Sequence, residues 1–361
     1  MKKTTELTGE ESYEEDDSNE APPPDVVAYN ELRSCADLFR MSKQGILDLQ
    51  PDFQRDVVWS ATDQTRFVDS LIKQLQIPSM CFSLDYKTQK WLVIDGLQRL
   101  STIVKFLKGT DWKLSKLEDI TPQISGKLVS SMKEENTDLH HFYQRVENLT
   151  LPITVLRCDY SKKTHMEYLF TIFHRLNSGG MKLKNQEIRN CIYGGVLNLL
   201  LRELDTTLSW RKLNRMKKDD NQRLTKQELI LRYFAFSERQ SKYSGSLSKF
   251  LNSYMADYRE ASPAKIESLR SSFVRVSDFI WNRIFNQVLP SKISITLLEA
   301  TLVGVGKNIS SLELKQDSEI KRMFAALGEN PNFNDSLILE GTSKTQRVKD
   351  RLAAAERIFS G

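Results

Sequence analysis

The sequence lacks any apolar run long enough to cross a membrane. A transmembrane helix needs roughly 18 consecutive apolar residues, and the best stretch here, around Val196 to Leu201, is a fraction of that length. The start of the chain, Met1-Lys2-Lys3 followed by acids, has no apolar core of a secretory signal. With 40% hydrophobic and 27% charged residues, the composition is that of a globular protein. We therefore expect no membrane contact and a cytoplasmic location.

Cysteine is scarce and scattered. The 4 cysteines lie dozens of residues apart and form no Cys-x-x-Cys pair, so neither a zinc knuckle nor another metal site is expected. In a chain without a secretion signal, they are interpreted as reduced thiols that are buried like small apolar side chains. They are Cys35, Cys81, Cys158 and Cys191.

Charge is unevenly distributed along the chain. Residues 1–25 hold nine acids and two lysines, and they include three consecutive prolines and few large apolar groups, so we expect a disordered acidic tail. The rest of the chain holds 50 basic and 38 acidic residues. Such a basic body is typical of proteins that contact the phosphates of nucleic acids or nucleotides, although solubility alone also accounts for it.

Hydrophobic periodicity alternates between strand and helix up to about residue 186. We expect strands at 45–50, 80–84, 91–94 and 151–156, and helices at 32–39, 63–75, 97–107 and 167–176. The polar segment 109–150 is expected to be a helical insertion or lid. Helix patterns dominate from about 187 onward. The sequence therefore predicts an α+β domain at 26–186, followed by an all-α domain at 187–361.

The strongest local signal is the run Trp91-Leu-Val-Ile-Asp95-Gly96-Leu97-Gln98-Arg99-Leu100. An apolar strand leads into Asp-Gly, and a helix begins at once. We expect Asp95 to cap this helix and Gly96 to let another group approach the backbone. A cation in the first turn, Arg99, opposes the helix dipole, but a phosphate bound to the first-turn amides would reverse that effect. The alternative is a hairpin turn with a solvated arginine.

Two further clusters place polar side chains in loops. The first, Phe53-Gln54-Arg55 with Trp59, follows a predicted strand, where ligand groups are common; the alternative is a pair of aromatic core anchors beside a salt-bridged arginine. The second, Arg175-Leu176-Asn177-Ser-Gly-Gly180, ends a predicted helix and precedes Glu187-Ile-Arg189. An ordinary helix stop explains it equally well.

In order and spacing, these segments together resemble one family. They are similar to the N-terminal domain of GmrSD-type modification-dependent restriction proteins, a ParB/sulfiredoxin-like domain of bacterial anti-phage defence systems. The matching segments are Phe53-Gln54-Arg55…Val58-Trp59, Gln76-Ile77-Pro78, Ile94-Asp95-Gly96-Leu97-Gln98-Arg99-Leu100 and Asn177-Ser178-Gly179-Gly180…Leu183…Glu187-Ile-Arg189. The resemblance extends over about residues 30 to 235.

The resemblance implies binding and hydrolysis of a nucleoside triphosphate with Mg²⁺. It assigns the catalytic residues as Asp95, Gln98 and Arg99. It assigns the nucleotide-binding residues as Gln54, Arg55, Gly96 and Asn177. One position departs from the family pattern, because Leu97 stands where relatives have glutamine. On the helix pattern alone we expect Leu97 to face the core, on the same side as Leu100.

The resemblance further implies a restriction or defence system directed at foreign DNA. Full-length relatives often carry an HNH nuclease, which needs histidine both for its metal and as a general base. None of the 4 histidines lies beyond His174, so we expect no HNH nuclease here and a separate effector nuclease as partner. The alternative function is a non-hydrolysing regulatory subunit that binds nucleotide or DNA. A ParB-like nuclease is a third reading, and assembly as a homo-oligomer stays open.

A basic segment in the helical half is the candidate DNA contact. Residues 211–226 hold seven basic and two acidic side chains just after Trp210, and such cations bind phosphates without sequence preference. A solvated loop is the alternative. The proposed contacts are Arg211, Lys212, Arg215, Lys217 and Lys218.

Overall fold

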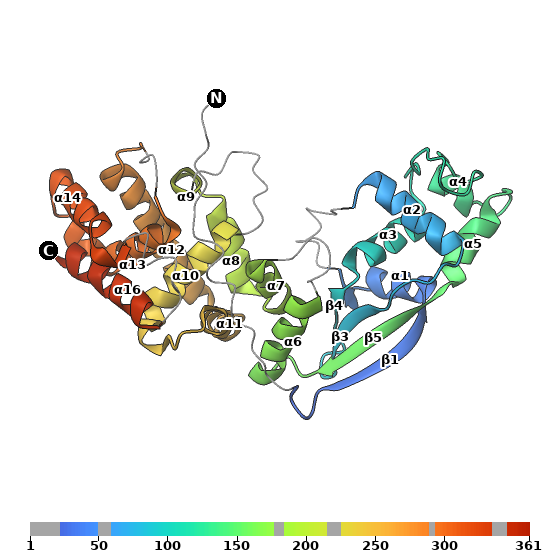
Figure 1. The fold of residues 1–361 in the computed structure, drawn as a ribbon, viewed down its shortest axis with the longest axis horizontal. Helices are drawn as coiled ribbons and strands as arrows, with labels where there is room; N and C mark the ends of the chain where they lie inside the picture. The colour runs from blue at the N-terminus through green and yellow to red at the C-terminus, as the bar shows by residue number, and fades with distance from the viewer. Residues whose placement is uncertain (1–21, 50–58, 177–183, 215–224, 289–292, 334–344) are drawn as a thin grey trace. The chain divides into compact units, whose positions relative to one another are not determined.

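The computed structural model describes residues 22–49, 59–176, 184–214, 225–288, 293–333 and 345–361. They form two compact units, one within Glu20–Lys182 and one within Leu183–Gly361. The first unit combines a sheet with helices and the second is helical (Figure 1). The predicted order of a mixed α+β part followed by a helical part is therefore confirmed.

In the described part of the first unit, the sheet has five strands in the order β1-β5-β3-β4-β2. β1 pairs antiparallel with β5, β5 pairs parallel with β3, β3 antiparallel with β4, and β4 parallel with β2. The strand bounds are β1 Val27–Ser34, β2 Leu47–Asp48, β3 Met80–Asp85, β4 Trp91–Asp95 and β5 Thr150–Cys158.

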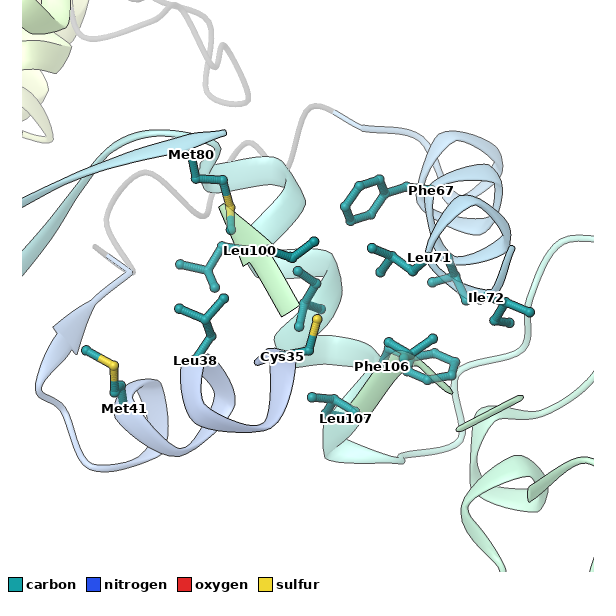
Figure 2. Packing of buried hydrophobic residues seen from close by; sticks show 14 of the residues in the cluster. Cys35, Leu38, Met41, Phe67, Leu71, Ile72, Met80, Leu100, Phe106 and Leu107 are labelled. Carbon is teal, nitrogen blue, oxygen red and sulfur yellow. The ribbon is translucent and has the colours of Figure 1, made fainter. Parts of the chain in front are cut away.

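Helix α3, Leu97–Lys108, lies at the centre of the packing on one face of this sheet. Helix α1, Cys35–Lys43, contacts it on one side and α2, Ala61–Ile72, on the other. Figure 2 shows side chains of α1 and α2 pointing toward Leu100 and Phe106 of α3, both of which are fully buried. The position of α3 is thus fixed from two sides by apolar contact.

The segment between α3 and β5 differs from the predicted polar, helical insertion. It holds two short helices, α4 Val129–Lys133 and α5 His140–Asn148, joined by turns. Its apolar side chains belong to the same core cluster as the apolar side chains of α3. The buried hydroxyl of Tyr143 donates to the carbonyl of Leu107 at 2.9 Å. The segment is therefore part of the core. Its buried apolar residues are Leu114, Ile120, Ile124, Val129, Met132, Phe142, Tyr143 and Val146.

The first strand was not foreseen from the sequence. Residues Leu32 to Phe39 show helical spacing, but β1 continues to Ser34 and the helix begins only at Cys35. The pairing of β1 with β5 overrides the local pattern, because it satisfies the backbone of the whole strand. The side chain of Ser34 then caps α1 by accepting from the amide of Asp37.

The end of the predicted acidic tail is ordered against the first unit. Asp25 forms ion pairs with Lys162 and with His165, whose side chain is 1% exposed. Lys162 and His165 hold the pKa of Asp25 at about 2, below its usual value of 3.8. Asp25 therefore belongs to the folded unit; residues 1–21 lie outside the described residues.

Helix α6, Lys163–Leu176, follows β5 and contacts β4.

The buried cysteines of the first unit are Cys35, Cys81 and Cys158. Burial raises the pKa of the Cys35 and Cys81 thiols to about 12. These side chains are therefore protonated at neutral pH and behave as small apolar groups, as predicted; Cys191 is half-buried.

The second unit packs its helices around an aromatic centre that includes Trp210, Phe234 and Phe273. α12 continues into a π-helical turn, Ile280–Ile284. Within the described ranges, every helix is too short or too polar to span a lipid bilayer. The bounds are α7 Asn185–Ile192, α8 Val196–Asp205, α9 Leu208–Leu213, α10 Thr225–Arg239, α11 Leu247–Asp257, α12 Pro263–Phe279, α13 Ile295–Leu312, α14 Asp317–Gly328 and α16 Thr345–Ser360.

Replacement of Gly96 by alanine should lower the free energy of unfolding by about 1–3 kcal/mol. Gly96 has φ +94°, where a side chain is strained, and a Cβ there would lie 2.5 Å from Cγ of Met80. Gly45→Ala is the matched control, because Gly45 has φ +67° but no atom within 4 Å of the added Cβ. Urea unfolding should show the larger loss for Gly96→Ala; equal losses would mean that the Met80 contact has no effect.

Candidate functional site

The strand–turn–helix predicted around Asp95 and Gly96 is present. β4 ends at Asp95, Gly96 adopts the left-handed conformation with φ 94° and ψ 14°, and α3 begins at Leu97. Gly96 is the N-cap residue and provides no side-chain hydrogen bond to the first turn. The first turn of α3 is therefore uncapped by a side chain, which leaves it suited to bind an anion.

The group that approaches Gly96 most closely is a side chain of the protein. Met80, the first residue of β3, lies against Gly96, where any Cβ would collide with it. The side chain of Met80 is 1% exposed. The glycine is therefore required by the junction of β4 and α3 itself, whether or not a ligand binds nearby.

Asp95 does not cap α3, contrary to expectation. Its Oδ2 atom accepts from Nη2 of Arg99 at 2.7 Å, one helical turn further along. The guanidinium of Arg99 also donates to the carbonyls of Pro78 and Ser79, in the segment that leads into β3. Arg99 is therefore held in place by a carboxylate and two carbonyls. The side chain of Arg99 is 15% exposed and that of Asp95 is 39% exposed.

Gln98 links α3 to the segment that precedes α2. Its Oε1 atom accepts from the backbone amide of Trp59 at 3.4 Å. The carbonyl of Trp59 accepts from Gln64 at 3.2 Å, and Oε1 of Gln64 accepts from Lys105 of α3 at 2.7 Å. Two of the predicted motif segments, those around Trp59 and Gln98, are thus adjacent in space.

The remaining nucleotide-binding residues predicted from the sequence, Gln54, Arg55 and Asn177, lie outside the described residues. Residue 59 follows the first gap directly and is bound to α3 as described above. α6, which ends at Leu176 just before Asn177, contacts β4. Their assignment stays a prediction.

Leu97 packs against the core cluster and is partly buried. This confirms the prediction that it faces the core on the same side as Leu100. A glutamine at this position would place an amide against apolar side chains. Of residues 97 and 98, it is therefore Gln98 that places a polar side chain at the first turn of α3.

A magnesium ion at this site would depend mainly on the ligand. No group of three or more His, Cys, Asp or Glu side chains capable of holding a metal occurs in the part of the chain that the structure describes. Asp95 offers a carboxylate at the site, and its Oδ2 is already bound to Arg99. Mg²⁺ typically takes one or two protein carboxylates, with phosphates and water completing its shell, so Asp95 fits such an ion only as a supplementary ligand.

The predicted DNA contact is described in part. Arg211 and Lys212 lie in the last turn of α9, and the exposed Lys212 has its Nζ 5.4 Å from the ring centroid of Trp281. Arg215, Lys217 and Lys218 lie outside the described residues. DNA binding by this segment stays a prediction.

Arg189, in the segment Glu187-Ile-Arg189, makes structural contacts inside the second unit. Arg189 is 1% exposed, and its guanidinium donates to Glu228 of α10 at 2.7 Å and to Asn252 of α11 at 2.9 Å. Glu228 also pairs with Arg232, which reaches Glu299 of α13 at 3.3 Å. This buried network connects four helices of the second unit. Sequence reasoning missed Glu228, because nothing in its local pattern distinguishes it from an exposed helix residue.

Comparison with known families identifies the segment that contains this site. Residues 35–194 match the family model of the GmrSD restriction endonuclease, N-terminal domain. This segment belongs to that family. The GmrSD match includes β4, Gly96 and the first turn of α3, and it continues into α7, which contains Arg189. It links the protein to a restriction or defence system and confirms the resemblance seen in the sequence. No curated protein and no solved structure matches the chain.

Glu228→Gln should lower the free energy of unfolding by about 3–5 kcal/mol at pH 7, because it removes the carboxylate that the buried side chains of Arg189 and Arg232 share. Burial alone would raise the pKa of Glu228, but Arg232 and Arg189 lower it from 4.5 to about 2. A carboxylate with a lowered pKa stabilises the fold above its unfolded pKa, and this contribution is lost as the pH falls from about 4.5 toward 2.

Urea unfolding at a series of pH values from 7 to 3 would measure both effects. The matched control is Glu203→Gln, because Glu203 is 52% exposed and pairs with Arg270 at the surface; it should lose less than about 1 kcal/mol. A loss for Glu228→Gln as small as that of the control would contradict a buried network.

Proposed function

We propose that this protein binds and hydrolyses a nucleoside triphosphate as the sensor or regulatory component of a DNA restriction system. The observation that supports this most directly is the first turn of α3. It has no side-chain cap, and the held guanidinium of Arg99 and the amide of Gln98 lie on the same turn. Backbone amides at a helix start together with an arginine are a common arrangement for binding phosphate.

Asp95 and Arg99 have different roles in the proposed site. Asp95 holds the guanidinium, which is therefore oriented before a ligand arrives. Such preorganisation reduces the entropy lost when a phosphate is bound. Mg²⁺ carried by the phosphates would neutralise part of their charge and reduce repulsion from the Asp95 carboxylate.

The wider assignment rests on the family and extends beyond the described geometry. We include in the proposal a ParB/sulfiredoxin-like fold for the first unit, a cytoplasmic location, DNA contact through the basic segment that starts at Arg211, and a separate effector nuclease as partner. The assigned cofactor is a nucleoside triphosphate with Mg²⁺.

Arg99→Ala should weaken nucleotide binding by about 1.5–3 kcal/mol, the contribution of hydrogen bonds to a charged group. Isothermal calorimetry with each of the four nucleoside triphosphates and Mg²⁺ would measure it. Because Arg99 also holds the carbonyls of Pro78 and Ser79, the thermal midpoint of the variant must be measured alongside.

Arg66→Ala is the matched control, since Arg66 pairs with Asp119 on the surface of the same unit at 2.8 Å. It should leave nucleotide affinity unchanged. Unchanged affinity of a folded Arg99→Ala protein would exclude a phosphate contact by this arginine.

Gln98→Ala should lower steady-state turnover about 100-fold or more while most of the binding affinity is retained, the pattern of a group that acts in the transition state. The physical reason is that Gln98 has the polar side chain able to orient an attacking water, whereas Leu97 packs on the core. Gln98→Glu is the informative second variant, because it keeps an oxygen to accept the amide of Trp59 but removes the donor. Leu97→Gln should raise turnover or leave it unchanged.

A non-hydrolysing regulatory subunit is the second candidate, and the position of Leu97 favours it, because one amide of the family pattern is missing from the turn. Phosphate release measured with every nucleoside triphosphate, with and without DNA, distinguishes the two. If the wild-type protein binds nucleotide but shows no turnover under any of these conditions, the regulatory function replaces the enzymatic one.

A further inference from the structure

Four strands place one residue each in a single row across the sheet. Asn30 of β1 is the register partner of Thr154 of β5, which is the partner of Cys81 of β3, which is the partner of Asp95 of β4. Register partners project from the same face of a sheet. The row therefore runs along one face, from the start of α3 to the edge strand β1.

Hydrogen bonds order the polar members of this row. The hydroxyl of Thr154 donates to Oδ1 of Asn30 at 2.9 Å, and it lies 3.1 Å from the hydroxyl of Ser79, which precedes β3. The carbonyl of Ser79 in turn lies 3.5 Å from Nη1 of Arg99. A continuous chain of polar contacts thus leads from Arg99 to Asn30.

This chain fixes which end of the Asn30 amide is available to a ligand. A hydroxyl has one hydrogen. That of Thr154 is directed to Asn30, and that of Ser79 is directed to the carbonyl of Met80 at 3.2 Å. Because Oδ1 of Asn30 accepts from Thr154, the amide is turned with its Nδ2 group, a donor of two hydrogen bonds, away from this partner.

The surroundings of the row combine polar and apolar groups. Asn30 and Ser79 are exposed and Thr154 is half-buried. Leu32 lies two residues along β1, on the same face as Asn30, and its side chain is 70% exposed. The register of β3 shifts between Cys81 and Phe82, an irregularity that is frequent beside binding sites.

The dimensions suit a mononucleotide. Asn30 and Asp95 are separated by three strand spacings, or about 14 Å at about 4.8 Å each. Phosphates at the start of α3 would therefore place the sugar and the base over Thr154 and Asn30. An exposed leucine beside an amide donor offers an apolar surface to the face of a base and a hydrogen bond to an acceptor on its edge.

We propose that this row binds the nucleoside part of the nucleotide, with Asn30 donating through Nδ2 to an acceptor on the base, Leu32 contacting the face of the base, and Thr154 acting as a positioning residue for Asn30. This inference rests on the proposed function, because the phosphates of the same nucleotide occupy the start of α3.

The test compares a nucleotide with inorganic tripolyphosphate, which has the phosphates but no nucleoside. The nucleotide is the triphosphate that the wild-type protein binds most tightly among the four. Asn30→Ala should weaken its binding about tenfold, the effect of one hydrogen bond, while the affinity for tripolyphosphate changes less than twofold. The ratio of affinities among the four triphosphates should fall toward one.

Two further variants separate positioning from folding. Thr154→Val keeps the shape of the side chain but removes the hydroxyl, so it should weaken nucleotide binding and reduce base preference, and Thr154→Ser should restore both. The matched control is Asn148→Ala, because Asn148 is exposed on α5 and donates to the carbonyl of Gln144. It should change neither affinity.

The outcomes distinguish this inference from the function on which it rests. If the wild-type protein binds neither nucleotide nor tripolyphosphate, the proposed function fails and the inference fails with it. If both bind, and Asn30→Ala weakens both equally or neither, the phosphate site stands and the nucleoside row is wrong. Selective loss of nucleotide binding in Asn30→Ala, with rescue by Thr154→Ser but not by Thr154→Val, supports it.

Discussion

In the first unit, the single residue Gly96 connects the end of β4 to the start of α3. The packing of the rest of the unit depends on this connection. β3 pairs with β4 up to Cys81 and Asp95, so Met80 lies directly beside the turn. A residue with a side chain at position 96 would meet both an unfavourable left-handed backbone and the atoms of Met80. Gly96 allows α3 to begin immediately over the sheet, and α3 then buries Leu100, Ile103 and Phe106 between α1 and α2. The candidate site and the apolar core of the unit therefore both depend on the connection between β4 and α3 at Gly96.

Arg99 shows how the same junction serves both stability and ligand binding. Its cation near a helix start is unfavourable by itself, and Asp95 offsets this at 2.7 Å. The carbonyls of Pro78 and Ser79 complete the set of acceptors, so the guanidinium also fixes the entry to β3. A phosphate would therefore meet a guanidinium already oriented by three groups of the protein.

Much of the α+β unit could be predicted because its elements have strong local signals. α2 has a Ser60–Asp63 capping box and a regular apolar face, and β3 and β4 are short apolar runs around a polar turn. β1 could not be predicted in this way, since it is stabilised by pairing with a strand more than a hundred residues later in the sequence. The segment 109–150 was misjudged for a related reason. Its apolar residues are widely spaced among polar ones and come together only when α3 is in place.

The candidate site was predictable as a turn but not as a set of contacts. Asp-Gly after an apolar strand indicates where a helix begins, yet nothing in the local sequence shows that Asp95 binds Arg99 rather than the helix amides. Two of the arginines in the family segments, Arg99 and Arg189, illustrate the difference. Arg99 lies in the first turn of α3 with part of its side chain exposed, whereas Arg189 is enclosed by Glu228 and Asn252 in the second unit. Both belong to the same ordered set of segments, but a guanidinium that is 1% exposed and already paired with the carboxylate of Glu228 has no route to a ligand without breaking that pair. Presence in a family motif therefore does not by itself assign a residue to the ligand; burial and existing partners decide which arginine can reach one.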